Sequence, residues 1–224
     1  DRVVSYALKN KNSFLEKLKD FGSFASVGAD PSMSNEMELA RKFIEKRLDE
    51  IGFTNQKRLF PSKRCVNPSI FAERLDAPGK PTILIYAHYD VQPPDPIDKW
   101  MTPPFEPTII KNKIYGRGLS DDKAPMLIAL ETLSSFIAVE GKLPINVKVL
   151  IEGEEETGSP SLEEILKKFK KLLCSDAVLS ADGARWQPNL ISLNVGSRGN
   201  VGFEIKLTTA KQDLHSGRYG GIVK

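Results

Sequence analysis

Three short apolar runs in this chain each end close to acidic residues or a histidine. The runs cover residues 82–87, 145–151 and 177–180, and their branched side chains are typical of buried strands. Segments with helical character separate them, at about 123–139 and at 161–173. Strands that alternate with helices predict an α/β fold with a mainly parallel sheet and helices on both faces.

The residues that follow these runs are the ones that carry chemistry. They are His88 and Asp90 after the first run, Glu154–Glu156 after the second and Asp182 after the third. A further acidic pair, Asp121–Asp122, comes just before the first helical segment. In an open α/β sheet, ligands bind outside the carboxyl ends of the strands. We therefore expect these side chains to meet at one edge of the sheet.

So many carboxylates at one edge repel one another strongly unless a cation lies among them. A divalent ion removes this repulsion, and two ions that share a carboxylate do so better. Histidine together with carboxylates suits zinc, manganese or cobalt, whereas calcium and magnesium prefer shells of oxygen alone. His88 and Asp90 lie two apart in extended chain and face the same side, so Asp90 could accept the spare imidazole N–H.

Each of these elements also has an ordinary structural explanation when it is taken alone. His88 could be a structural histidine, Asp121–Asp122 a helix cap and Glu154–Glu156 a solvated acidic turn. Residues 116–118 are a weak match to a phosphate-binding loop that lacks the third glycine. The order of the elements and their shared place at strand ends favour a metal site.

Four ordered motifs resemble the M20 family of metallopeptidases, and within it the dipeptidase-like branch. They are YAHYDVQP at 86–93, YGRGLSDDK at 115–123, EGEEETGS at 152–159, and DLHSG at 213–217 with YGG at 219–221. The resemblance covers nearly the whole chain. It implies a catalytic domain with the α/β fold of zinc peptidases, followed by an α+β lid domain.

The resemblance also implies a ligand set for two divalent metal ions, zinc in the first place and manganese or cobalt as alternatives. His88 and Asp182 would bind one ion, Glu156 would bind the other, and Asp121 would bridge the two. The Asp121–Asp122 peptide is expected in the cis form, a costly geometry that usually marks function.

Three further residues receive catalytic roles from the same resemblance. Asp90 would orient His88, and Glu155 would be the general base. Because three glutamates are consecutive, a slip of one residue would exchange Glu155 for Glu154. His215 would reach from the lid into an active site, in related dimers that of the partner subunit, and stabilise the oxyanion; it could instead be an ordinary lid histidine.

The implied activity is a two-metal hydrolase that cleaves dipeptides or small peptides. Two ions roughly 3.5–4 Å apart would hold a bridging water and lower its pKa. Glu155 would take the proton of the attacking water and pass it to the leaving amine. An N-acyl-amino-acid deacylase or a carboxypeptidase of the same family is the main alternative. A metal-binding protein that has lost catalysis and a phosphoesterase that uses Asp121–Asp122 are alternatives from other classes.

A change in composition near Pro188 predicts two domains. Residues 1–187 would be an incomplete catalytic domain, and residues 188–224 would be the start of the lid and dimerisation domain, with strands at 190–193 and 201–207. The family's second metal-binding histidine lies far towards the C-terminus, and His88 and His215 are the chain's 2 histidines. We therefore expect a truncated chain that is inactive by itself and a homodimer for the longer protein.

The remaining features of the sequence exclude other classes. A net charge of +3 is too small to predict a nucleic-acid partner, and the basic run at 167–171 is interpreted as a solvated helix face. No apolar stretch approaches the roughly 20 residues of a membrane span. Cys65 and Cys174 are expected to be free thiols. These points favour the cytosol, although the chain starts at Asp1 and a leader could have been removed.

Overall fold

A computed structural model describes residues 1–62, 64–183, 187, 190, 192–196, 199–207, 212 and 214–221 of the chain. The chain divides into two compact units, Asp1–Trp186 and Gln187–Lys224. None of the helices in the described part combines the length and the apolar character that a membrane crossing needs.

The first unit is built on a five-stranded sheet in the order β1–β2–β6–β3–β7. Its strands are Thr54–Leu59 (β1), Ser69–Arg74 (β2), Thr82–His88 (β3), Asn146–Glu152 (β6) and Ala177–Ser180 (β7). β3 is parallel to both β6 and β7, whereas β2 is antiparallel to β1 and to β6. All strands except β2 therefore run in one direction, which confirms the mainly parallel sheet.

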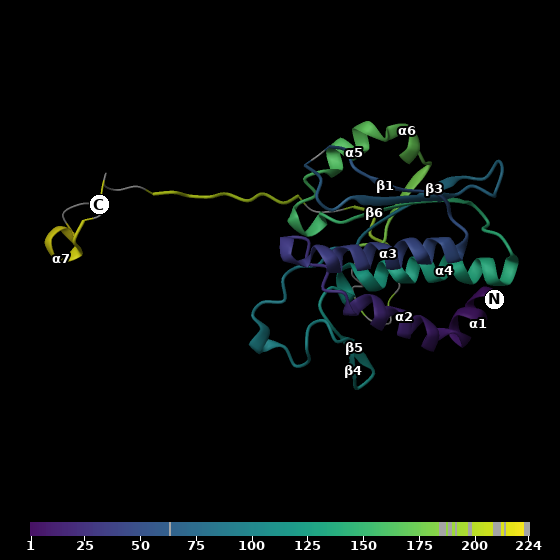
Figure 1. The fold of residues 1–224 in the computed structure, drawn as a ribbon, viewed down its shortest axis with the longest axis horizontal. Helices are drawn as coiled ribbons and strands as arrows, with labels where there is room; N and C mark the ends of the chain where they lie inside the picture. Colours follow the sequence, from purple (N-terminus) through teal and green to yellow (C-terminus); the bar gives the residue numbers. More distant parts are fainter. Residues whose placement is uncertain are drawn as a thin grey trace. The chain divides into compact units, whose positions relative to one another are not determined.

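Helices cover both faces of this sheet (Figure 1). One face carries α3 (Ser34–Ile51) and α4 (Ala124–Glu140), and α1 (Arg2–Lys9) and α2 (Lys11–Ser23) pack against α4. The other face carries α5 (Leu162–Lys168) and α6 (Lys170–Leu173). The sheet separates two hydrophobic cores, a larger one on the side of α3 and α4 and a smaller one on the side of α5 and α6. Because side chains alternate along a strand, Val149 of β6 lies in the larger core and Leu150 in the smaller one.

The predicted helices are present, with differences at their ends. α3 stops before Gly52, whose φ of 84° is the left-handed conformation that favours glycine. α3 begins at Ser34, and Met33 occupies the N-cap position without a side-chain hydrogen bond. The segment 161–173 is two helices rather than one, because Phe169 leaves the helical conformation and packs against the smaller core.

β7 corrects the expectation of a buried strand at 177–180. It lies at the end of the strand order, so one of its edges has no partner strand in the described part of the chain. All four of its residues are exposed, including Val178 and Leu179. Its sequence is as apolar as that of a central strand, and only its place in the order distinguishes it.

Two pairs of strands were not predicted. β1 and β2 extend the sheet on the side away from β7. A separate hairpin joins Thr108–Ile110 (β4) to Lys113–Tyr115 (β5). Its turn residues, Lys111 and Asn112, both have positive φ, 48° and 65°, as two-residue hairpin turns of the mirror-image type require.

The second unit contains one short helix in its described part, Ser216–Tyr219 (α7). The strand predicted at 201–207 is absent, and Val201 and Phe203 are 72% and 83% exposed. Alternating apolar residues form a strand only when a neighbour completes the hydrogen bonds, and no described residue pairs with this segment. Residues 190, 192 and 193 are likewise outside any strand, while Ile191 falls outside the described residues.

Candidate metal centre

His88 is the last residue of β3, and its side chain is completely buried. Its ring nitrogen Nδ1 lies 3.0 Å from the backbone oxygen of Asp90 and 3.5 Å from the carboxylate oxygen Oδ1 of the same residue. Both neighbours are acceptors, so Nδ1 carries a proton and donates it. The backbone N–H of His88 donates to Asp122 Oδ2 at 3.2 Å. These contacts fix the ring and leave Nε2 directed at the carboxyl edge of the sheet.

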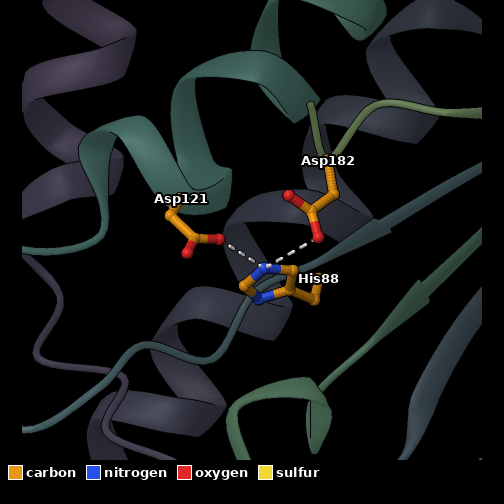
Figure 2. A group of neighbouring side chains, drawn as sticks. All are labelled: His88, Asp121 and Asp182. Atoms are coloured by element: carbon orange, nitrogen blue, oxygen red, sulfur yellow. Dashed lines mark hydrogen bonds and ion pairs between the residues drawn. The ribbon is translucent and has the colours of Figure 1, made fainter. Parts of the chain in front are cut away.

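Two carboxylates point at this nitrogen from distant parts of the chain (Figure 2). Nε2 of His88 lies 2.9 Å from Asp121 Oδ1 and 3.9 Å from Asp182 Oδ2. Asp121 lies in the segment Leu119–Lys123 that precedes α4, where its own backbone is extended rather than helical (φ −136°, ψ 94°), and Asp182 follows β7. One ligand atom from each of the three residues lies within 4.8 Å of the others. The strand-end meeting expected from the sequence is therefore observed for His88, Asp121 and Asp182.

The electrostatics of this group fit a cation. Burial alone would lower the pKa of His88, but the hydrogen bond to Asp90 and the charges of Asp90 and Asp122 outweigh it and raise the pKa to about 10. The carboxylates around His88 therefore stabilise a positive charge at its imidazole. A divalent ion would supply the same positive charge. One ring nitrogen and two carboxylates also form an N/O ligand set of the kind that zinc and similar metals use.

The glutamates that follow β6 are tied to the same region by Asp90. The backbone N–H groups of Glu155 and Glu156 donate to Asp90 Oδ1 and Oδ2, at 3.3 and 3.0 Å. The sequence predicted that the carboxylate of Asp90 would orient His88. In the structure the nearer acceptor for His88 is the backbone oxygen of Asp90, and its carboxylate holds the glutamate turn. Asp90 thus joins the two strand ends.

The three consecutive glutamates point in different directions. Glu155 Oε2 lies 3.9 Å from His88 Nε2. Glu154 is buried, and its Oε1 accepts the backbone N–H groups of Val66 and Asn67, at 3.0 and 3.2 Å. The side chain of Glu154 is therefore bound to the loop that precedes β2. This arrangement supports the alignment that makes Glu155, rather than Glu154, the candidate base.

The environment of Glu155 suits a proton acceptor. Burial raises the pKa of its carboxyl group, the charge of His88 lowers it, and the charges of Glu156, Asp182 and Asp90 raise it again, with a net upward shift. A carboxylate with a raised pKa is a stronger base, and general bases work best when their pKa lies near the working pH.

Glu156 lies outside the group formed by His88, Asp121 and Asp182. Its Oε2 accepts a hydrogen bond from the side-chain amide of Gln92 at 2.9 Å, and its backbone oxygen accepts from the same nitrogen at 3.0 Å. The predicted second ion, with Glu156 as ligand and Asp121 as bridge, therefore stays a prediction.

Two buried charged residues follow Asp121 in the chain; sequence reasoning assigned Asp122 no role apart from its pairing with Asp121, and it assigned Lys123 none. Asp122 is fully buried, and its Oδ1 has no hydrogen-bond partner among the described residues. Burial raises the pKa of Asp122 to about 7. Lys123 donates from Nζ to the backbone oxygens of Phe21 and Phe24, at 3.1 and 2.6 Å, and burial lowers its pKa to about 7. The Asp121–Asp122 peptide is cis, as expected.

The loop that follows α2 packs against the segment that follows His88 and forms hydrogen bonds with it. Ser26 Oγ donates to the backbone oxygen of Tyr89 at 2.7 Å, and the backbone N–H of Val91 donates to Ser26 at 2.9 Å. A Cβ atom on Gly28 would lie 3.0 Å from both Cβ and Oδ2 of Asp90. Glycine thus permits a close approach to Asp90, and no signal in a single sequence could have identified this role.

His215 lies in the second unit, one residue before α7, and its side chain is exposed. Its Nδ1 accepts the backbone N–H of Gly217 at 3.1 Å. This contact is local, and the oxyanion role of His215 stays a prediction. Asp213, from the same motif, falls outside the described residues.

Comparisons with known proteins agree with this geometry. The profile of peptidase family M20/M25/M40 matches residues 84–216. The chain is 32% identical to the Beta-Ala-His dipeptidase of Rattus norvegicus over 100% of the chain and 48% of that protein. It is 34% identical to the Cys-Gly metallodipeptidase DUG1 of Candida albicans over 95% of the chain and 47% of that protein. The chain thus spans about half the length of these curated relatives.

The fold has the same relatives. The crystal structure of human carnosine dipeptidase 1 superposes with a TM-score of 0.75 at 32% sequence identity. The match covers 81% of this chain and 41% of that structure. The α/β arrangement that places the candidate site is therefore shared with a solved dipeptidase.

Proposed function

Because the chain belongs to peptidase family M20/M25/M40, we propose that its protein is a metal-dependent dipeptidase. The observation that carries the proposal is the meeting of His88 Nε2 with carboxylates of Asp121 and Asp182, all within 4.8 Å. A carboxylate that can act as a base, Glu155, lies 3.9 Å from the same nitrogen. The relatives from Rattus norvegicus and Candida albicans, which match 100% and 95% of the chain, are named as dipeptidases, which favours dipeptides over acyl-amino acids as substrates.

We assign His88 and Asp182 to one divalent ion, Glu156 to a second, and Asp121 to both. Such ions, when bound, polarise a scissile carbonyl and lower the pKa of water towards neutrality. Zinc is the first candidate and manganese or cobalt the next, because the ligand set combines imidazole with carboxylates. Asp90 keeps the Nδ1 proton of His88 in place, so that Nε2 presents its lone pair to the ion.

Glu155 is the proposed proton carrier of the reaction. As the oxygen of a water molecule forms a bond to the peptide carbonyl carbon, Glu155 accepts one proton of that water. The C–N bond then breaks, and Glu155 returns the proton to the leaving amine. Its half-buried place beside His88 supports this role, because a carboxylate in that setting is more basic than one in water.

The unit Asp1–Trp186 is proposed to be the catalytic domain, and Gln187–Lys224 to belong to the lid and dimerisation domain. His215 in the second unit is proposed to donate a hydrogen bond to the developing oxyanion. Removing one such donor costs about 10²–10³ in rate. In the dimer that the resemblance implies, this donor would come from the partner subunit.

A substrate panel tests the proposal. The protein, stripped with a chelator, would be supplied with Zn²⁺, Mn²⁺ or Co²⁺ and assayed with β-Ala-His, Cys-Gly, an N-acetyl-amino acid, a longer peptide and a phosphomonoester. We expect dipeptide hydrolysis that disappears on chelation and returns with metal. Cleavage of the N-acetyl-amino acid or the longer peptide alone would replace dipeptidase by deacylase or carboxypeptidase, and phosphatase activity alone would refute the peptidase.

A further inference from the structure

We propose that Gln92 is a positioning residue that sets the orientation of Glu156. The inference rests on the proposed function, in which Glu156 is a ligand of the second ion. Its own basis is the pair of hydrogen bonds that the side-chain amide of Gln92 makes to Glu156, one to the backbone oxygen at 3.0 Å and one to Oε2 at 2.9 Å.

The chemistry of these two bonds restricts the glutamate closely. The NH₂ group of Gln92 has two protons, and both are used on the same residue. One bond fixes the backbone of Glu156 and the other fixes the end of its side chain, so rotation about the intervening bonds is restricted. Oε1 receives neither of these protons, which keeps that oxygen available to an ion.

The backbone of Glu156 is held from its other side by Asp90, whose Oδ2 accepts the N–H of Glu156 at 3.0 Å. Asp90 and Gln92 belong to the segment that directly follows His88 at the end of β3. A single stretch of chain therefore carries one metal ligand and clamps another. If β3 moves, His88 and Glu156 move together, which would keep the separation between the two ion sites constant.

An exposed glutamine that donates hydrogen bonds is common on protein surfaces, and the chain offers a matched control for that explanation. Gln56 in β1 is another glutamine whose amide donates to one backbone oxygen, that of Glu45 at 3.3 Å, and to one carboxylate, that of Asp49. Both of these acceptors lie on α3. Gln56 thus has the same kind of partners as Gln92 without a connection to the candidate ligands.

The test compares Gln92→Leu with Gln56→Leu in the purified, full-length, metal-free enzyme. Leucine has nearly the size of glutamine and no donor. Co²⁺ would be titrated calorimetrically and by its visible absorption, and kcat and KM would be measured with the best dipeptide. Changes in groups that orient a metal ligand typically cost 10–100-fold in affinity, so Gln92→Leu should weaken one of two Co²⁺ sites about tenfold or more.

The other readouts separate positioning from general stability. Gln92→Leu should lower kcat by a similar factor and leave KM within about twofold. Its melting temperature should equal that of Gln56→Leu, because Gln92 is exposed and is not part of a hydrophobic core. Gln92→Asn keeps the donors on a shorter side chain and should fall between the wild type and Gln92→Leu.

The outcomes distinguish the two proposals. If the wild type binds two Co²⁺ ions and hydrolyses dipeptides while Gln92→Leu matches it in both affinities and in kcat, the role of Gln92 is refuted and the function stands. Equal weakening of both ions, or equal losses in Gln92→Leu and Gln56→Leu, would also refute a specific role. A wild type that binds no Co²⁺ would refute the metallopeptidase and this inference with it.

Discussion

His88 and Glu156 follow neighbouring strands of one sheet, yet the chain holds them in different ways. His88 ends β3, is completely buried, and has its ring and backbone fixed by Asp90 and Asp122. Glu156 lies four residues beyond Glu152, the partner of His88 in the register of β3 and β6. It is only half-buried; its backbone N–H donates to Asp90, and its carboxylate accepts from Gln92.

The difference shows that one sheet edge can hold two proposed ligands in different ways. A strand end with a buried side chain is rigid because packing and the ladder fix it, whereas a turn beyond a strand has few such restraints. The glutamate turn is restrained by hydrogen bonds to Asp90 and Gln92, which belong to the segment that follows β3. We therefore expect a change at Asp90, which contacts both His88 and the glutamate turn, to affect both metal sites, and a change at Gln92 or on the turn itself to stay local.

The largest effect is expected from Glu155→Gln, which alters the turn alone. Glutamine keeps the shape but accepts no proton, so kcat should fall by about 10²–10⁴, the usual contribution of a general base. Both metal affinities should stay unchanged, as measured by calorimetric Co²⁺ titration. Glu164→Gln, an exposed change on α5, is the control. Unaltered turnover in Glu155→Gln would remove the base assignment, and loss of an ion would show that the turn is not independent.

Asp90→Asn is expected to have the next largest effect, because it breaks the link between His88 and the glutamate turn. The charge that favours the orientation of His88 is lost, and one acceptor for the N–H groups of Glu155 and Glu156 becomes a donor. Both metal affinities should fall by about 10–100-fold. Co²⁺ titration measures them separately, and a loss confined to one ion would contradict the proposed dependence of the turn on β3.

The sequence predicted the group around His88 better than the glutamate turn. His88, Asp121 and Asp182 were expected to meet because carboxyl ends of parallel strands share an edge, and that rule depends only on topology. The position of Glu156 beside Gln92 depends on hydrogen bonds between two loops, which periodicity does not report. The family resemblance implied that Glu156 is a metal ligand but gave no partner for it, and it gave Gln92 no role.

The same distinction applies to the fold. β3, β6 and the helix α4 were predicted because each forms a long or strongly apolar pattern. β2 was missed although it is buried at residues 69–72, since its apolar run is short and starts with a serine. The strand expected at 201–207 failed for the opposite reason, because an alternating pattern without a paired neighbour does not make a sheet.

Gly28→Ala should produce a smaller effect that tests the support behind Asp90. The added methyl group would lie 3.0 Å from Asp90 Oδ2 and 3.3 Å from the backbone oxygen of Gly153, so both strand ends must shift. Overpacking of this kind typically costs about 1–3 kcal/mol, and thermal unfolding would measure it. Activity should fall a few-fold. Gly202→Ala, where a Cβ meets nothing within 4 Å, is the control and should be neutral. Equal stability of the two variants would show that the loop at 26–28 does not restrain Asp90.

The smallest effect is expected from Asp122→Asn in the metal-free protein, and it depends on pH. Burial raises the pKa of Asp122 from 3.8 to about 7, so the folded state holds a proton that the unfolded state releases. The resulting stabilisation is complete below about pH 4 and is lost as the pH rises to about 7.

Asparagine carries no such charge, so Asp122→Asn should gain on the order of 1 kcal/mol over the wild type between pH 5 and pH 8 in urea unfolding with a chelator present. Added Zn²⁺ should reduce that gain at pH 8, because an ion near His88 favours the ionised carboxylate that the asparagine lacks. A constant difference at both pH values would mean that Asp122 is ionised in the folded state throughout, and that its buried charge needs no nearby ion.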